Sequence, residues 1–284
     1  MISTWITIAS LLGVIALVAG VFFLERYLKL RARKNLMRQP TPDAWPPTLE
    51  KNFPLYRLIP QDIKSHLHQY MHVFLAEKSY EGCGGLEITE EIRVSIAAQA
   101  CLLLLNNRGN FYPNLRSILV YPDEYINRRG LILRSDHDER DERVLIGESW
   151  HSGSVVLSWK HVRQGARIID DGLNVVFHEF AHQLDQVSGN TDGTPELSSS
   201  ERYGAWSATM KSAYERFNRR IDRGQRTLFD EYGATNPAEF FAVATETFFE
   251  KARRMKKEYP DLYQEFVNFY QLDPASWRPP DVEA

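Results

Sequence analysis

The sequence predicts an α+β domain that follows an N-terminal transmembrane helix. Three observations carry this prediction: a charge-free apolar run near the N-terminus, strand-like segments in the first part of the remaining chain, and long helical patterns after them. Strands that precede helices, rather than alternate with them, favour α+β over a doubly wound sheet. The hydrophobic content of 43% suffices for a packed core and argues against a disordered chain.

The apolar run extends from Trp5 to Leu24 and matches the roughly 20 residues that a helix needs to cross a bilayer. Basic residues are absent before this run and numerous directly after it, at Arg26, Lys29, Arg31, Arg33, Lys34 and Arg38. The positive-inside rule therefore predicts a single-pass anchor in the cell inner membrane, with the rest of the chain in the cytoplasm. The alternatives are a cleaved signal peptide, whose basic segment would come first, and a buried helix of a soluble protein.

Four segments follow from these patterns. We predict an anchor with a basic flank over residues 1–38, a Pro-rich linker over 39–48, one domain over 49–276 and a C-terminal tail over 277–284. Lys and Arg total 34 against 37 for Asp and Glu, so no direct nucleic-acid binding is expected. The only cysteines are Cys83 and Cys101, too few for a disulfide framework, and the apolar surroundings of Cys101 predict a buried free thiol.

The secondary structure expected after the linker is mixed. Thr89 has the position of a helix N-cap, and Pro122 closes a strand-like run. Charge alone predicts a solvated loop over 136–143, and prolines predict coil near the C-terminus. The expected helices cover 61–75, 89–105, 173–185, 199–221 and 237–256, and the expected strands cover 86–87, 117–121 and 154–159.

The helix expected over 173–185 carries a candidate metal site, Phe177-His-Glu-Phe-Ala-His182. Two histidines four residues apart lie on one helix face, so the imidazoles of His178 and His182 can reach the same ion. Glu179 projects beside them and can take a proton from a water that the ion activates. The plainer alternative is two helix histidines and a solvated glutamate, but the match lies within an amphipathic helix that follows a strand. We therefore predict a metal site.

A catalytic zinc ion usually has a third protein ligand. The metzincin extension of the motif is excluded, because Asp185 and Ser188 stand where it needs Gly and His. The spacing leaves three candidates open: Glu239, which we favour, Glu246 on roughly the same helix face, and Asp230.

The favoured candidate also has a purely structural reading. Asn236, Pro237 and Glu239 stand at the cap, first and third positions of a helix start. This pattern alone does not decide whether Glu239 is a metal ligand or a carboxylate that caps the helix.

At these residues the chain resembles the MtfA (Mlc titration factor A) family of zinc peptidases. That family is similar to the gluzincins, including the catalytic domain of anthrax lethal factor. The resemblance implies a zincin-like metallopeptidase domain, with a small sheet plus active-site helices, that uses Zn²⁺ to cut a peptide or protein substrate. The segments that carry it are Gly147-Glu-Ser-Trp…Val-Leu-Ser-Trp159, His178-Glu-Phe-Ala-His-Gln-Leu-Asp185, Tyr232-Gly-Ala-Thr-Asn-Pro-Ala-Glu-Phe-Phe-Ala242 and Phe269-Tyr-Gln-Leu-Asp-Pro274.

The resemblance also implies residue roles. It makes His178, His182 and Glu239 the zinc ligands and Glu179 the general base. Tyr232 would donate a hydrogen bond to the oxyanion that develops during peptide hydrolysis.

This chain departs from the expected pattern in two respects. The Asp that thermolysin-type enzymes have four residues after the third ligand is missing, because Val243 stands there. Asp185 is instead the candidate to orient one of the ligands through a hydrogen bond, and the alternative is that it only solvates the end of the helix. The best-known family members are cytosolic and have no anchor, which bears on the partner rather than on the chemistry.

Two functions follow as expectations. The first is a zinc metallopeptidase, with aminopeptidase action one option, which binds an extended substrate along the edge strand 154–159. The alternative is a membrane-tethered binding module that sequesters an Mlc-like transcription repressor and has weak or secondary peptidase activity. The intact set of catalytic residues favours the first, because binding alone does not need them.

Overall fold

The computed structural model describes residues 2–105, 111–123, 125–126, 132–133, 153–189 and 191–277. The chain forms two units, Met1–Pro40 and Thr41–Ala284. The predicted loop over 136–143, the Gly147-Glu-Ser-Trp segment and most of the predicted tail lie outside the described residues.

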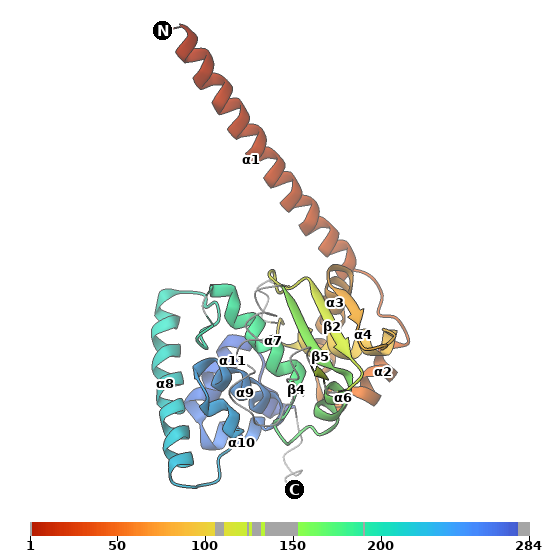
Figure 1. Ribbon diagram of the computed structural model, residues 1–284, viewed down its shortest axis with the longest axis vertical. Coiled ribbons are helices and arrows are strands. Elements are labelled where there is room, and N and C mark those ends of the chain that lie inside the picture. The colour runs from red at the N-terminus through yellow and green to blue at the C-terminus, as the bar shows by residue number, and fades with distance from the viewer. Residues whose placement is uncertain are drawn as a thin grey trace. The chain divides into compact units, whose positions relative to one another are not determined.

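The first unit consists of α1 (Ile2–Met37), one continuous helix of 36 residues (Figure 1). Its part over Leu11–Met37 is long and apolar enough to cross a membrane, and none of its most apolar window is buried. A core helix of a soluble domain would be covered by other elements. The exposed window therefore favours the membrane anchor, which remains a prediction.

Three described strands form a parallel sheet in the order β1-β2-β5, with bounds Ser79–Gly82 (β1), Ser117–Tyr121 (β2) and Ser154–Ser158 (β5). Along β2 and β5 buried and half-buried residues alternate, because successive side chains of a strand point to opposite faces. A separate antiparallel pair joins β3 (Tyr125–Ile126) to β4 (Ile132–Leu133).

The strands predicted at 117–121 and 154–159 are confirmed, although the second ends at Ser158. The strand predicted at 86–87 is wrong: β1 comes earlier, at Ser79–Gly82. Gly84 and Gly85 follow β1 with φ of 60° and 83°, so the chain turns there and residues 86–87 lie outside the sheet.

Most of the described residues of the second unit are helical. Helical bounds are α2 Trp45–Asn52, α3 Gln61–Glu77, α4 Glu90–Leu102, α6 Trp159–Arg167, α7 Val175–Asp185, α8 Ser200–Asp222, α9 Pro237–Glu250, α10 Ala252–Glu258 and α11 Pro260–Tyr270. Short 3₁₀ turns are η1 Pro54–Leu58, η2 Gln186–Ser188, η3 Glu231–Ala234 and η4 Pro274–Ser276.

All five predicted helices are present, with corrections at their ends. The backbone of Lys251 leaves the helical region, so the helix predicted over 237–256 is split into α9 and α10. Pro260 begins α11 instead of coil, because a proline is well tolerated at the first helical position. Thr89 caps α4 as predicted and accepts a hydrogen bond from Ile92 N at 3.3 Å. Residues 45–48 of the predicted linker are helical, in α2.

Helix α7 lies between the sheet and the C-terminal helices. It packs against α4, α9 and β5, and Figure 1 shows it between the strands and the group α8–α11. Every residue of α9 after Pro237 is buried. Because α7 and α9 contact each other along buried faces, side chains from both helices are brought together inside the domain. Cys101 is a buried free thiol, as predicted.

Candidate metal centre

The start of α7 is determined by Asn174. Its side-chain oxygen accepts hydrogen bonds from Val176 N and Phe177 N, both at 3.1 Å, and so caps the first turn. The apolar side of the helix is fully buried, at Val176, Phe177, Phe180 and Ala181. Docking of that side leaves the histidines on a face that meets α9.

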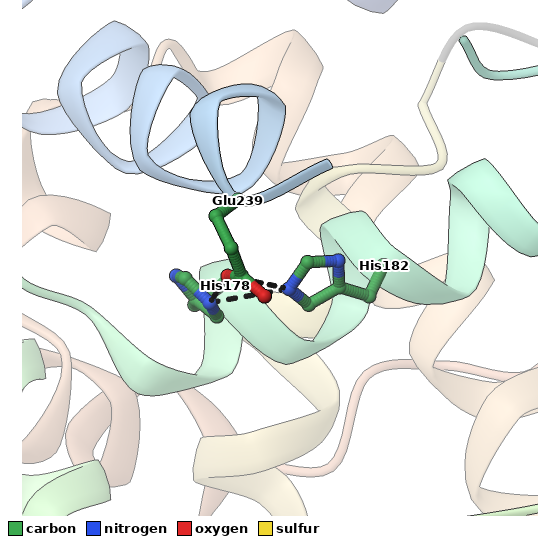
Figure 2. Close-up of side chains that lie close together, drawn as sticks. All are labelled: His178, His182 and Glu239. Atoms are coloured by element: carbon green, nitrogen blue, oxygen red, sulfur yellow. Dashed lines mark hydrogen bonds and ion pairs between the residues drawn. The ribbon is translucent and has the colours of Figure 1, made fainter. Parts of the chain in front are cut away.

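The start of α9 places the carboxylate from the second helix. Asn236 accepts a hydrogen bond from Glu239 N at 3.0 Å, and Pro237 occupies the first helical position. Glu239 itself is 5% exposed, and its carboxylate points at the two histidines of α7 (Figure 2). A capping role is therefore filled by Asn236, which frees the Glu239 carboxylate for another one.

Three ligand atoms converge on one point between the helices (Figure 2). Glu239 Oε2 lies 3.0 Å from His178 Nε2 and 3.2 Å from His182 Nε2, and the two Nε2 atoms are 3.2 Å apart. Atoms bound at about 2.0–2.1 Å by a tetrahedral zinc ion lie roughly 3.3 Å from one another. Two imidazole nitrogens and one carboxylate oxygen at this spacing fit a zinc ion.

The charges around this point favour a cation. Burial opposes ionisation of Glu239, but the charge of His182 and hydrogen bonds from both histidines hold the pKa of Glu239 well below its usual value. Burial also disfavours a charged His178, yet hydrogen bonds to Glu239 and Glu246 raise its pKa well above the ordinary value. The carboxylates therefore stabilise positive charge where a metal would bind.

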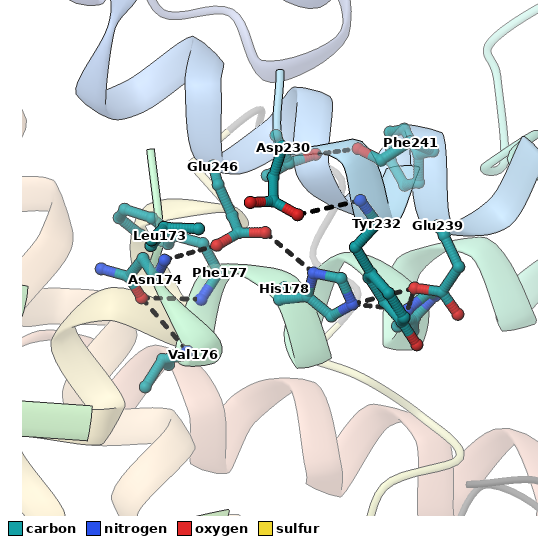
Figure 3. Close-up of polar contacts among 12 residues, drawn as sticks. Leu173, Asn174, Val176, Phe177, His178, Asp230, Tyr232, Glu239, Phe241 and Glu246 are labelled. Carbon is teal, nitrogen blue, oxygen red and sulfur yellow. Dashed lines mark hydrogen bonds and ion pairs between the residues drawn. The ribbon is translucent and has the colours of Figure 1, made fainter. Parts of the chain in front are cut away.

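The other two candidates for the third ligand lie elsewhere (Figure 3). Glu246 Oε1 lies within hydrogen-bond distance of His178 Nδ1, at 2.8 Å, on the side of the ring that faces away from Glu239. Asp230 caps η3 by accepting a hydrogen bond from Tyr232 N at 2.9 Å. Of the three, Glu239 is the one whose carboxylate joins the two histidines.

Glu179 and Tyr232 are both neighbours of His178, the first along α7 and the second in space. Glu179 follows His178 directly on α7 and is half-buried. Tyr232 lies in η3, and the centroid of its ring is 5.8 Å from that of His178 (Figure 3). The Asp230 cap fixes the backbone of Tyr232, so the phenol is held beside the histidines by local structure.

Asp185 lies at the end of α7, fully buried, and holds the loop that follows. Its Oδ2 accepts a hydrogen bond from Gly193 N at 2.8 Å. A Cβ atom on Gly193 would lie 2.4 Å from Pro237 O, so this loop touches the start of α9. Asp185 thus supports the spacing of the two helices.

The sequence predicted Glu246 only as an alternative metal ligand and did not predict its contact with His178 Nδ1. The one indication in the sequence was that Glu246 lies on roughly the same face of α9 as Glu239.

Two histidines one turn apart on a buried helix, joined by a glutamate from a second helix, are the features of a metallopeptidase. The chain belongs to the glucose-regulated metallo-peptidase M90 family, whose profile matches residues 27–271. The matched region begins after the apolar run that ends at Leu24, so that run is additional to the family domain.

Similar proteins agree with this assignment. An uncharacterized protein of Synechocystis sp. is 38% identical over 96% of this chain and 98% of its own length, a coverage that must include most of α1. Mlc titration factor A of Klebsiella pneumoniae (strain 342) is 34% identical over 71% of this chain and 76% of its own. That of Escherichia coli O7:K1 is 31% identical over 78% and 84%. The resemblance to the MtfA family is confirmed.

Proposed function

We propose that this chain is a zinc-dependent peptidase. The observation that carries the proposal is the convergence of His178, His182 and Glu239 at 3.0–3.2 Å between two buried helices. The donor set suits zinc, because two imidazoles and one carboxylate leave a position open for water or substrate. A bound zinc ion supplies a Lewis acid that lowers the pKa of a water to about 7 and polarises a carbonyl.

Glu179 is the proposed general base. It takes a proton from the attacking water as oxygen adds to the peptide carbonyl carbon, and it then delivers that proton to the leaving amine as the C–N bond breaks. Its position directly after His178 on α7 and its half-buried side chain support this role, because such a side chain is neither sealed in the core nor fully exposed.

Tyr232 is the proposed oxyanion donor. The carbonyl oxygen becomes negatively charged in the tetrahedral state, and a phenol O–H held nearby lowers the energy of that charge. The ring lies beside His178, and the Asp230 cap limits the movement of its backbone.

An extended substrate is proposed to add to β5. Within the part of the chain that the structure describes, β5 is paired with β2 on one side and forms an edge of the sheet. Its backbone N–H and C=O groups offer the pairing that extended peptides use in strand addition. β5 also contacts α7, which brings such a peptide towards the metal ligands.

We further propose that α1 anchors the domain in the cell inner membrane, with the domain in the cytoplasm. The apolar length of α1 and the basic residues directly after Leu24 support this placement. Trapping of α1 in the bilayer would hold the peptidase near membrane-bound substrates.

Replacement of Glu179 by Gln tests the catalytic proposal. The purified full-length protein in detergent is incubated with a peptide library, and bound zinc is measured by elemental analysis. We expect Glu179→Gln to keep one zinc per chain and to lose hydrolysis, whereas Glu201→Gln on the exposed start of α8 keeps both. Undiminished hydrolysis in Glu179→Gln would refute the mechanism.

A second candidate function is capture of a transcription repressor, with peptidase activity secondary. The names of the relatives, Mlc titration factor A, favour it. The same Glu179→Gln protein separates the two functions. A binding module keeps its repressor partner and its cellular effect in this variant, whereas a peptidase loses the effect.

A further inference from the structure

We infer that Glu246 is a positioning residue that sets the tautomer and the ring orientation of His178. This inference rests on the proposed zinc site and deepens it.

The contact with His178 determines which ring nitrogen faces the metal. Glu246 Oε1 lies 2.8 Å from His178 Nδ1. An ionised carboxylate can only accept hydrogen bonds, so Nδ1 carries the proton. In the neutral imidazole that a metal binds, the lone pair of His178 then lies on Nε2, the atom that faces Glu239 and His182. Carboxylates that orient metal-bound histidines in this way raise metal affinity.

The second oxygen of the same carboxylate fixes the helix that carries His178. Glu246 Oε2 accepts a hydrogen bond from the backbone N–H of Asn174, the N-cap of α7 (Figure 3). One side chain of α9 therefore holds both the first turn of α7 and the imidazole one turn further on. Glu246 is 4% exposed, so water does not compete for either oxygen.

The Asn174 side chain makes this arrangement rigid. Its Nδ2 donates hydrogen bonds to Gln99 Oε1 at 2.9 Å and to Glu250 Oε1 at 3.1 Å. Its oxygen meanwhile caps α7. Asn174 thus ties α4, α7 and α9 together, and the backbone N–H that Glu246 accepts has a fixed position.

The missing Asp at position 243 has a structural reason. Val243 is buried and lies against η3, where a Cβ atom on Gly233 would be 3.3 Å from the Val243 Cβ. A carboxylate at 243 would be buried in this apolar contact. Glu246, one turn further along α9, reaches Nδ1 without disturbing the packing of η3.

An amide cannot replace the Glu246 carboxylate. The carboxylate accepts from two donors, but a glutamine offers one acceptor oxygen and one NH₂ donor. If its oxygen faces the Asn174 N–H, its NH₂ group faces His178 Nδ1 and favours the tautomer with the proton on Nε2. That proton occupies the position of the metal. If the amide turns over, the Asn174 N–H loses its acceptor.

The test measures zinc affinity, by competition with a chromogenic chelator, for full-length wild type, Glu246→Gln and Glu250→Gln in detergent. Glu250 is the matched control, because it is a buried glutamate one turn later. It accepts a hydrogen bond from Asn174 Nδ2, and an amide oxygen can accept the same bond. We expect Glu246→Gln to bind zinc about 10–100-fold more weakly. Glu250→Gln should match the wild type.

Equal zinc affinity in wild type and Glu246→Gln would overturn the inference and leave the proposed function standing. A wild type that binds no zinc would overturn both. If Glu246→Gln does not fold, ¹⁵N spectra of the zinc-loaded wild type decide the matter. A protonated Nδ1 and a metal-bound Nε2 on His178 support the inference, and the opposite tautomer refutes it.

Discussion

Glu239 and Glu246, two turns apart on α9, contact opposite nitrogens of one imidazole. Glu239 Oε2 lies 3.0 Å from His178 Nε2, and Glu246 Oε1 lies 2.8 Å from His178 Nδ1. Two glutamates on roughly the same face of α9 therefore have two different roles. One carboxylate joins the ligand set, and the other holds a ligand from behind.

Replacement of Tyr232 by Phe should lower the rate of hydrolysis without loss of zinc. Removal of one oxyanion donor reduces kcat by about 10²–10³-fold, because the bond is made in the transition state. KM and zinc stoichiometry should stay unchanged. The measurement is steady-state kinetics on a peptide found with the library. A large rise in KM with constant kcat would show a role in substrate binding instead.

Gly193→Ala should destabilise the domain and weaken zinc binding. The residue has φ of 79°, and its Cβ would meet Pro237 O at 2.4 Å, so the start of α9 must move. The matched control is Gly189→Ala, at φ of 89° with nothing within 4 Å of the new Cβ. The backbone strain of about 1–2 kcal/mol is common to both.

Overpacking adds roughly 1–3 kcal/mol at Gly193 alone. Chemical denaturation and zinc titration of both variants give the difference. If both substitutions lower the free energy of unfolding and the zinc affinity equally, the backbone around Pro237 relaxes at little cost and the contact does not position α9.

Removal of zinc should lower the thermal stability of the domain. A ligand present at about 1,000 times its dissociation constant stabilises the folded state by about 4 kcal/mol. We expect a chelator to lower Tm in the wild type and to have no effect on His182→Ala, which lacks a ligand. A chelator effect of equal size in both proteins would place the stabilising metal elsewhere.

Asp185 should make the stability of the zinc-free domain depend on pH. Burial, opposed by the Gly193 N–H and by the charge of His182, raises the pKa of Asp185 from 3.8 to about 6. An acid with a raised native pKa binds its proton more tightly when folded. The free energy of unfolding therefore falls as pH rises from about 4 to 6 and is level above that range.

The change attributable to Asp185 is on the order of 2–3 kcal/mol, from about two units at 1.36 kcal/mol each. The difference between wild type and Asp185→Asn, measured by urea denaturation across this range with chelator present, isolates it. A pH-independent difference would show that Asp185 keeps an ordinary pKa.

Local patterns predicted most of the elements. Thr89 before an apolar repeat placed α4, and Asn236-Pro237 placed α9, because caps and first-turn prolines act within a few residues. Errors arose where neighbours decide the outcome. The split at Lys251 carries no distinct local signal, and β1 exists because β2 lies beside it. The start of α11 had a first-turn proline, Pro260, but the prolines near the C-terminus were taken to predict coil.

The sequence alone determined the pair His178 and His182, with Glu179 between them, because the helical repeat of about 3.6 residues places such neighbours on one face. It favoured Glu239 but left Glu246 and Asp230 open as third ligands, since the helical repeat within α9 says nothing about how α9 is rotated towards α7. Only tertiary packing decided that Glu239 meets both Nε2 atoms and that Glu246 lies behind His178. The physical reason is that distances between helices depend on how their buried faces fit together, and no local pattern records that fit.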